Sequence, residues 1–289
     1  MSQLNLLAPA KINLTLEILG KRPDQFHDLT SIIVSVNLCD EIKIEESSEL
    51  EIFCSNILIK KESNLAYLVA NALRNQYKIS TGAKITLSKN IPVAAGLGGG
   101  SSDAATTLIG LNKLWGLGLK IDQLSPIARS FGSDITFFLH NGTAMVQGKG
   151  DIIRTLPQAN IKYAVILSPD IPINNKTRLM FSKVTSSHYT KGALTRKLES
   201  RIRSRGDIPP ELLFNVFDPI SSELFPELKS TLQIFSEIWS EEIHICGAGP
   251  SLFTLVESRE IATALSLLLN KKTGFKSYVV EPTKAVEWN

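Results

Sequence analysis

The chain has 289 residues, of which 43% are hydrophobic and 20% charged, and its net charge is +3 at pH 7. This length can bury one large core or two modest ones, and the small charge does not favour binding to nucleic acid or to a membrane surface. The three cysteines lie far apart and form no C-x-x-C pair, so neither a disulfide framework nor a zinc site is indicated. We find no signal peptide and no apolar run of about 20 residues, and expect a cytoplasmic protein without a nucleic-acid, membrane or obligate protein partner.

Short strands and one helix are predicted in the first third of the chain. Residues 12–18 alternate between apolar and polar side chains, which is the period of a half-buried strand, and Lys11 and Asn13 fall on its polar face. A lysine on such a face is usually solvated. A helix is predicted over residues 64–75, with Ser63 or Asn64 as its cap. The other strands are predicted over residues 4–7, 30–38, 40–45, 50–53 and 83–88, with a polar loop over 20–29.

The next segment, residues 92–105, reads PVAAGLGGGSSDAA and leads into a helix predicted from about Ser101 to Trp115. Four of the five residues from 96 to 100 are glycines, which allow the backbone to approach a ligand closely. The first amides of a helix have no partner within it and attract anions. The segment therefore predicts a polyphosphate site. The residues of this site are Pro92, Val93, Ala94, Ala95, Gly96, Leu97, Gly98, Gly99, Gly100, Ser101 and Ser102.

Two common phosphate loops do not fit this glycine segment. A Walker loop requires a lysine after its last glycine, and none follows Gly100. A dinucleotide-binding loop requires a third glycine where this chain has Ser101, which weighs against a Rossmann oxidoreductase. A flexible turn between a strand and a helix remains the plain structural alternative.

The rest of the chain suggests two α+β layers that meet at a cleft. A helix is predicted over residues 121–131 with Asp122 as its cap, and Asp134 starts a further apolar segment, where capping is the plain structural alternative. The pair Leu156-Pro157 is a predicted joint, and the basic residues between 191 and 205 are typical of a solvated helix face. Beyond the joint, helices are predicted over 176–184, 194–203, 224–236 and 261–269, strands over 163–168, 243–245, 252–256 and 278–281, and a glycine turn over 246–251.

Three separated segments together resemble the motifs of the GHMP small-molecule kinases. They are PAKINL at residues 9–14, the glycine segment at 92–102, and GAGP at 247–250. The pair Phe26-His27 and the tripeptide Gly132-Ser133-Asp134 are similar to one branch of that family. Members of this branch phosphorylate a cytidine diphosphate-linked methylerythritol in the non-mevalonate route to isoprenoids. The resemblance runs the length of the chain.

The resemblance implies an α+β fold of two domains. Residues 1–157 would form a GHMP kinase N-terminal, ATP-binding domain like domain 2 of ribosomal protein S5, and residues 158–289 a ferredoxin-like C-terminal domain. It also implies transfer of a phosphoryl group from ATP to the 2-hydroxyl of the substrate, with Mg²⁺ screening the phosphates held by the glycine segment. No residue is predicted as a ligand of a metal ion.

The same resemblance implies roles for single residues. Asp134 would accept the proton of the attacking hydroxyl, while Lys11 would keep this carboxylate ionised and stabilise charge on the phosphoryl oxygens. This requires two residues far apart in the sequence to meet. For the substrate, the implied residues are Phe26, stacked on the cytosine; His27, bonded to its edge; Asn13, near the acceptor chain; and Thr177 and Phe181, with Phe181 on the other cytosine face. Ordinary core packing is the alternative for the two phenylalanines.

Several positions depart from the pattern of this branch. The proline that usually follows the aspartate at the second position is replaced by Thr136, and the usual serines of the last glycine turn are replaced by Cys246 and Ala248. Any role of that turn in holding substrate must then depend on backbone amides. Residues 172–176 are also atypical, and we expect altered substrate affinity rather than lost chemistry.

Two alternatives share the expected scaffold. The first is a GHMP kinase for another small alcohol, such as mevalonate or homoserine, and binding of a cytidine nucleotide at Phe26 and His27 would distinguish it. The second is a non-catalytic nucleotide-binding protein, which the presence of both Lys11 and Asp134 disfavours.

Overall fold

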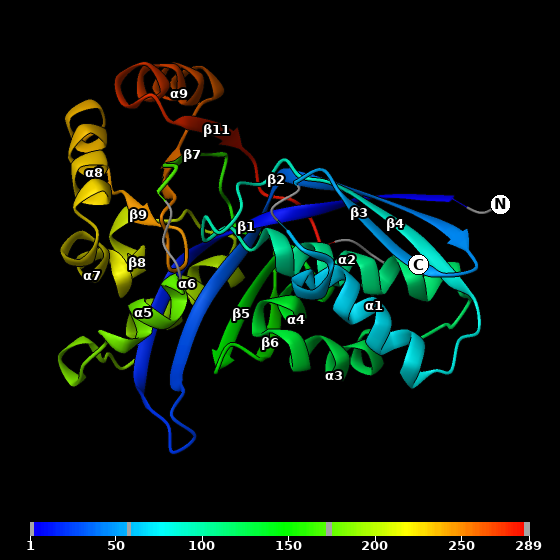
Figure 1. Ribbon diagram of the computed structural model, residues 1–289. Helices are drawn as coiled ribbons and strands as arrows, with labels where there is room; N and C mark the ends of the chain where they lie inside the picture. The colour runs from blue at the N-terminus through cyan, green and yellow to red at the C-terminus, as the bar shows by residue number, and fades with distance from the viewer. Residues whose placement is uncertain (1–2, 57–58, 172–174, 286–289) are drawn as a thin grey trace.

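The computed structural model describes residues 3–56, 59–171 and 175–285. Within these ranges the strands form two sheets, one of seven strands and one of four. In Figure 1 the larger sheet and its helices, apart from one short strand at residues 214–215, belong to the part of the chain coloured blue to green. The smaller sheet lies beside them, mostly in orange and red. This arrangement confirms the α+β fold that the resemblance implies.

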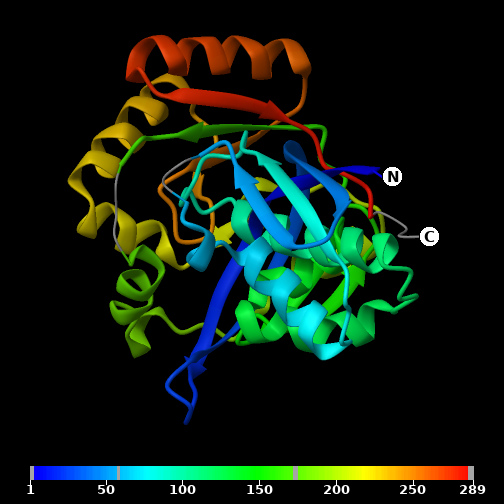
Figure 2. The same cartoon turned by 45° about the vertical axis from the view of Figure 1, so that its right-hand side comes forward.

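The larger sheet is built on two long strands, β1 (Gln3–Lys21) and β2 (His27–Ser47), which pair antiparallel along most of their length. The other side of β2 pairs near its start with β5 (Thr143–Gly148) and near its end with β4 (Gly82–Ser88). The tip of the β1–β2 hairpin projects from the body of the molecule in Figures 1 and 2. The remaining strands of this sheet are β3 (Leu50–Cys54), β6 (Ile152–Leu156) and β8 (Phe214–Asn215).

Both long strands are continuous where the sequence predicts two shorter ones. β1 runs through residues 8–11, the predicted interruption, with register shifts at Pro9/Ala10 and at Asn13/Thr15. β2 likewise continues through Cys39, opposite the first of these shifts. Bulges absorb extra residues without ending a strand, so the proline and the small residues of this segment do not break β1.

The helices α1 (Leu65–Gln76), α2 (Gly99–Leu114) and α4 (Ser133–His140) pack against the larger sheet, with α2 in contact with β1 and β2 (Figure 1). Helix α3 (Ile121–Phe131) packs on α1 and α4. The predicted cap of α1 is confirmed, since Asn64 Oδ1 accepts a hydrogen bond from the amide of Ala66 (3.0 Å). For α3 the predicted cap was wrong: Lys120 is the N-cap, and Asp122 lies in the first turn.

The smaller sheet is antiparallel throughout, with the order β11-β7-β10-β9. Along the chain, helices lie between β7 and β9 and again between β10 and β11. This is the β-α-β-β-α-β succession of the expected ferredoxin-like domain. Neither sheet is the parallel, doubly wound sheet of a Rossmann oxidoreductase. The strands are β7 (Tyr163–Ser168), β9 (His244–Ile245), β10 (Leu252–Val256) and β11 (Lys276–Val280).

The four helices predicted beyond residue 157 are all present, but the bounds of three differ by two residues or more. The first ends at residue 182 rather than 184, the third runs over 226–238 rather than 224–236, and the fourth over 259–273 rather than 261–269. Helix α7 and the short strand β8 were not predicted. Among the described residues, no helix is both long and apolar enough to cross a bilayer. These helices are α5 (Lys176–Ser182), α6 (Ala193–Arg203), α7 (Phe217–Leu224), α8 (Pro226–Ile238) and α9 (Arg259–Thr273).

The two parts of the chain share a core along β1. Ile12 and Leu14 of β1 belong to the same buried cluster as Ile166 of β7 and Phe253 of β10, and β8 pairs with β1 in parallel. β1 is therefore buried on both faces, although its alternating sequence predicts a solvated polar face. The polar side chains that are buried there are Lys11, Asn13, Thr15 and Glu17.

Candidate active site

The three segments that carry the family resemblance meet at one place. The backbone amide of Lys11 in β1 donates a hydrogen bond to the carbonyl oxygen of Leu97 in the glycine segment (3.0 Å). The amide of Ser251, which ends the last glycine turn, donates to the carbonyl oxygen of Ala95 in the same segment (3.1 Å). The glycine segment thus lies between the first and last motifs.

Two glycines make this close approach possible. A Cβ on Gly96 would lie 2.0 Å from the carbonyl oxygen of Cys246, and a Cβ on Gly247 would lie 2.8 Å from Nζ of Lys11. Both glycines also have a positive φ, which side chains disfavour. The backbone conformation and the lack of a side chain are therefore both needed where the segments meet.

The glycine segment leads directly into helix α2. Gly98 is the N-cap, with φ 74°, and the amide of Ser102 donates to its carbonyl oxygen (2.9 Å) in the first turn. The helix begins at Gly99, two residues before the predicted start. The amides of residues 99–101 precede the first bond within the helix and have no partner in it, as an anion site requires.

Lys11 lies in a polar network rather than in solvent. Its side chain is only 4% exposed, and its Nζ donates a hydrogen bond to Oδ1 of Asn13 (2.6 Å). The amide nitrogen of Asn13 donates in turn to Oγ of Ser31 on β2 (2.9 Å). Two predicted site residues, Lys11 and Asn13, are therefore in direct contact, and the plain alternative of a solvated lysine does not hold.

Asp134 lies in the first turn of α4, whose N-cap is Gly132, and its side chain makes no hydrogen bond or ion pair with a described residue. Phe138 is four residues further and shares its helix face. A Cβ on Gly98 would lie 2.9 Å from the Phe138 ring and 3.1 Å from Cγ of Lys11. This face of α4 thus borders the glycine segment and the Lys11 stem, while the convergence of Lys11 and Asp134 on one oxygen stays a prediction.

The replacement of the usual proline by Thr136 is compatible with α4. The helix begins at Ser133 and runs through Thr136, which is buried. Its hydroxyl has no hydrogen-bond partner among the described residues, and such a buried group is destabilising. Since α4 begins at Ser133 and continues through Thr136, the local turn forms without the proline.

Lys176 is a residue of the site that the sequence analysis did not single out. It begins α5 and is 8% exposed, and its Nζ donates a hydrogen bond to the carbonyl oxygen of Ala94 in the glycine segment (2.6 Å). Burial, followed by the charge of Lys11, lowers the pKa of Lys176 to about 8. The only sequence signal was the atypical segment 172–176, of which residues 172–174 lie outside the described residues.

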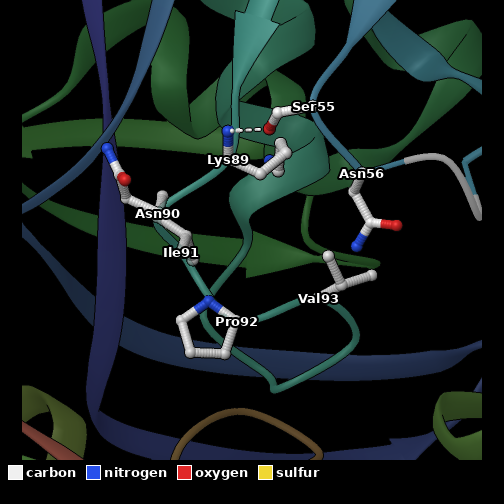
Figure 3. A pocket seen from close by; sticks show the side chains of 7 residues that line it. All are labelled: Ser55, Asn56, Lys89, Asn90, Ile91, Pro92 and Val93. Carbon is white, nitrogen blue, oxygen red and sulfur yellow. Dashed lines mark hydrogen bonds between the residues drawn. The ribbon is translucent and has the colours of Figure 1, made fainter.

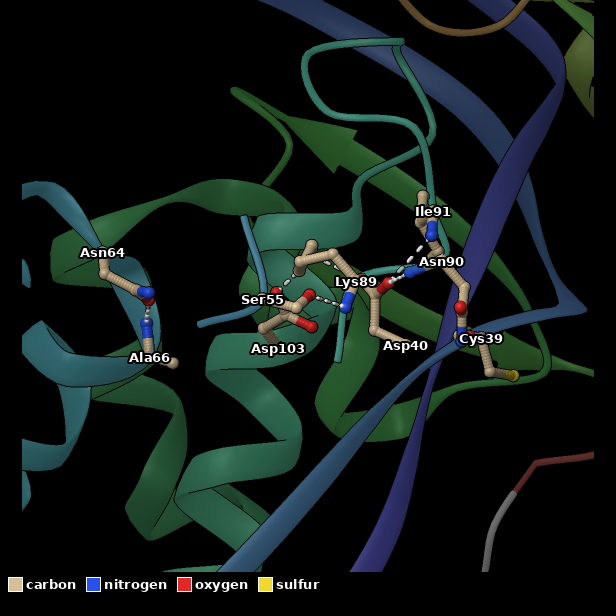
Figure 4. A network of polar contacts seen from close by, with 9 residues as sticks. All are labelled: Cys39, Asp40, Ser55, Asn64, Ala66, Lys89, Asn90, Ile91 and Asp103. Atoms are coloured by element: carbon tan, nitrogen blue, oxygen red, sulfur yellow. Dashed lines mark hydrogen bonds and ion pairs between the residues drawn. The ribbon is translucent and has the colours of Figure 1, made fainter. Parts of the chain in front are cut away.

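A buried cluster of charges holds the start of the glycine segment (Figure 4). Nζ of Lys89 bonds to Asp40 on β2 and to Oδ2 of Asp103 on α2 (2.5 Å). The other oxygen of Asp40 accepts hydrogen bonds from the amides of Asn90 (2.6 Å) and Ile91 (2.8 Å). Burial raises the pKa of Asp103 to about 7, against the opposing effect of Lys89. The sequence analysis missed this cluster because its members come from three separate elements.

A pocket of about 600 Å³ lies next to the start of the glycine segment (Figure 3). Residues 89–93 form one wall, and Ser55 and Asn56 form another. The wall includes Pro92 and Val93 of the predicted polyphosphate site, and Val93 is 51% exposed. The pocket therefore borders the first residues of the glycine segment.

The predicted cytosine-binding residues do not all lie together. Phe26 is 58% exposed at the hairpin tip, where Nζ of Lys149 lies 5.4 Å from its ring centroid. His27 instead stacks on Phe181 of α5, with ring centroids 5.4 Å apart. Burial, followed by the charge of Lys21, lowers the pKa of His27, which favours its neutral ring.

Phe181 and Thr177, the other two predicted substrate residues, both lie on α5 but differ in their surroundings. Phe181 packs edge-on against Phe217, with ring centroids 4.9 Å apart. One side of the Phe181 ring is therefore part of the core, as the plain structural alternative expects. Thr177 is exposed on α5. A direct role in binding for either residue stays a prediction.

The last glycine turn is held by side chains that the sequence analysis missed. Nδ2 of Asn215 on β8 donates to the carbonyl oxygens of Ile245 (2.8 Å) and Gly247 (2.9 Å). Cys246 is fully buried, and burial raises the pKa of its thiol to about 12. The turn is thus fixed through its backbone, although the usual serines are absent.

Comparison with known proteins agrees with this geometry. Residues 64–142 match the family model described as GHMP kinases N terminal domain. A solved homoserine kinase from Cytophaga hutchinsonii is 19% identical and has a TM-score of 0.75 over 99% of this chain and 96% of that one, which shows a shared fold. The fold and the three converging motifs define the class of protein as a GHMP kinase.

Relatives of higher identity narrow this class. A 4-diphosphocytidyl-2-C-methyl-D-erythritol kinase of Dehalococcoides mccartyi strain CBDB1 is 37% identical over 279 residues, which cover 96% of this chain and 97% of the relative. A crystal structure of 4-(cytidine 5'-diphospho)-2C-methyl-D-erythritol kinase is 27% identical, with a TM-score of 0.83 over 98% of this chain and all of that one. The chain belongs to the 4-diphosphocytidyl-2-C-methyl-D-erythritol kinase family, and is a phosphotransferase with ATP as co-substrate and an alcohol group as acceptor.

Proposed function

We propose that this kinase phosphorylates the 2-hydroxyl of 4-(cytidine 5'-diphospho)-2-C-methyl-D-erythritol in the non-mevalonate route to isoprenoids. The observation that carries this proposal is the meeting of Lys11, the glycine segment and the turn at residues 246–251. Membership of the family supports the choice of substrate.

The glycine segment and the start of α2 would hold the phosphates of ATP. Unpaired amides at residues 99–101 and the positive end of the helix dipole favour an anion there. The pocket lined by residues 89–93 lies where the base of the nucleotide would extend. Mg²⁺ would bind mainly to the phosphates of ATP, as is usual where a nucleotide is the substrate.

The residues around the acceptor would have three tasks. Asp134 would accept the proton of the attacking 2-hydroxyl as a general base. The ammonium of Lys11 would stabilise the charge that develops on the phosphoryl oxygens. The contact between Lys11 and Asn13 holds both side chains in one orientation, and Asn13 would position the acceptor chain.

The cytidine part of the substrate would bind near the tip of the hairpin. Phe26 is exposed and free to stack on a base, and the neutral ring of His27 can form a hydrogen bond with the edge of cytosine. Phe181 would lie against the other face of the base, with Thr177 nearby on α5. Because His27 already stacks on Phe181, a base between the two aromatic faces would require a change of side-chain position.

A coupled assay of ADP release with Mg-ATP tests the proposal. The acceptors are the cytidylyl methylerythritol, mevalonate and homoserine, each at the same concentration. We expect turnover with the first alone. Turnover with mevalonate or homoserine instead would assign the chain to another branch, and ATP binding without turnover of any acceptor would indicate a non-catalytic protein.

We also propose a domain boundary at residues 157 and 158 and a location in the cytoplasm. The boundary falls between β6 and β7, where the chain leaves the larger sheet for the smaller one. The three cysteines are all free thiols, which suits a reducing compartment.

A further inference from the structure

Two ammonium groups are buried at the meeting of the three motifs, and neither is paired with a carboxylate. Nζ of Lys11 donates to Asn13, and Nζ of Lys176 donates to the carbonyl oxygen of Ala94. Both side chains are more than nine-tenths buried. In the part of the chain that the structure describes, no Asp or Glu oxygen lies within 4.0 Å of either nitrogen.

The groups that face Lys176 come from three elements and do not balance its charge. Lys11 on β1 is a second cation, and Ala94 in the glycine segment offers only a carbonyl dipole. Cys246 in the turn after β9 is a neutral thiol, because burial raises its pKa to about 12. Buried charges without a counter-charge are unfavourable, so an anion is the expected partner of this pair.

We propose that Lys176 is a second phosphate-binding residue, which acts together with Lys11 on the terminal phosphate of ATP. This inference rests on the proposed function and deepens it. The hydrogen bond to Ala94 places the ammonium against the glycine segment. This location favours ATP over the diphosphate of the second substrate as the source of the phosphate.

The composition of the adjacent turn supports this role. Cys246 and Ala248 provide no hydroxyl donor beside the glycine segment. An ammonium has three donors, and only one of those on Lys176 is used by Ala94. Lys176 therefore has two further donors for the oxygens of a phosphate.

The variant Lys176→Gln separates charge from hydrogen bonding, because glutamine can still donate to the Ala94 carbonyl. Binding of Mg-AMP-PNP is measured by calorimetry at pH 7 and pH 9. An anion favours the protonated lysine, so a pKa of about 8 predicts that wild-type affinity falls about tenfold over this range. In Lys176→Gln we expect an affinity about ten- to a hundredfold lower at pH 7 and little further loss at pH 9.

Lys183→Gln is the matched control, because Lys183 is an exposed lysine at the other end of α5. It should bind like wild type at both pH values. Titration with CDP is the second arm, and we expect Lys176→Gln to leave it unchanged. Lys176→Met, also without charge, replaces the glutamine variant if that variant does not fold.

Three results would contradict parts of this account in different ways. Wild-type affinity and pH dependence in both neutral variants would overturn the role of Lys176. Weaker CDP binding with unchanged AMP-PNP binding would overturn the assignment to ATP, because the cation would then serve the other substrate. Failure of wild type and Lys183→Gln to bind AMP-PNP would overturn the proposed function, and the inference with it.

Discussion

Asp134 is the residue on which the proposed chemistry depends most. Asparagine has nearly the same shape but cannot accept the proton of the attacking hydroxyl, and general bases contribute about 10²–10⁴-fold to rates. We expect Asp134→Asn to lower kcat within that range and to leave Mg-AMP-PNP binding close to wild type. Steady-state kinetics and calorimetry measure the two effects. Asp122→Asn, at an exposed position of α3, is the control, and an unchanged kcat in Asp134→Asn would show that the base is another group.

Phe26 offers a test of the substrate at a position that affects the core little. Its ring is exposed at the hairpin tip, and stacking of a base on such a ring is worth about 1–3 kcal/mol. We therefore expect Phe26→Ala to weaken CDP binding by about 5- to 150-fold while the melting temperature stays nearly constant. Phe53→Ala removes another exposed phenylalanine, on β3, and should not affect CDP binding. Equal affinities in both variants would argue against a cytidine substrate at this hairpin.

The role of a single residue could be predicted where its motif is a continuous stretch of sequence. The glycine segment needs only the spacing of its glycines and the helix that follows. Lys176 was not predictable, because its contact with Ala94 depends on how α5 packs beside a segment far away in the sequence. For the same reason the pattern around Lys11 indicates a solvated strand face, although the second part of the chain buries it.

At the scale of elements, the cluster of Asp40, Lys89 and Asp103 ties the end of β4 to β2 and α2. Removal of the lysine leaves two buried carboxylates without a cation, which typically costs about 3–5 kcal/mol. We expect Lys89→Met to lower the free energy of unfolding by about this amount in urea titrations. Lys113→Met, at an exposed position of α2, should change it by no more than about 0.5 kcal/mol. Equal stability of the two variants would mean that the cluster does not hold the glycine segment in place.

The same cluster predicts a pH dependence of stability. Burial raises the pKa of Asp103 from 3.8 to about 7, so the folded chain binds a proton that the unfolded chain releases above pH 4. The contribution of this group to stability is thus present below pH 4 and is lost as the pH rises through 7. We expect the stability of wild type relative to Asp103→Asn to fall between pH 5 and pH 8 in urea titrations. The same comparison with the exposed Asp170→Asn should show no such trend, and a trend of opposite sign would contradict the raised pKa.

Elements were predicted best where one local signal decides them. Helix α1 has its apolar stripe and the Asn64 cap within a few residues, and its predicted bounds are within one residue of the observed ones. The strands are harder to predict, because their continuity depends on the partner strand. The break expected near Pro9 is absent, since β2 stays paired with β1 across the bulge. Strand β8 has two residues and exists only through its pairing with β1.

On the scale of the whole molecule, the two parts of the chain depend on each other at β1. Ile12 and Leu14 pack in one cluster with side chains of the smaller sheet. Glu17 is 1% exposed, and its carboxylate accepts a hydrogen bond from the amide of Thr195 at the start of α6 (2.8 Å). Lys11, the proposed catalytic lysine, lies against Gly247 of the last glycine turn, so the site needs both parts to be folded.

This dependence predicts that residues 1–157 do not fold alone, even though they contain the whole glycine segment. Without the second part, Ile12 and Leu14 lose their apolar neighbours, and the carboxylate of Glu17 loses the amide of Thr195. We expect the isolated fragment to bind a hydrophobic dye and to melt without a cooperative transition, whereas the full chain should show a single transition in calorimetry. A fragment with a sharp melting transition and affinity for Mg-AMP-PNP would show instead that the first part is an independent domain. That result would also mean that the ATP site forms without residues 158–289. The second part of the chain would then contribute to binding of the acceptor substrate rather than to folding of the ATP site.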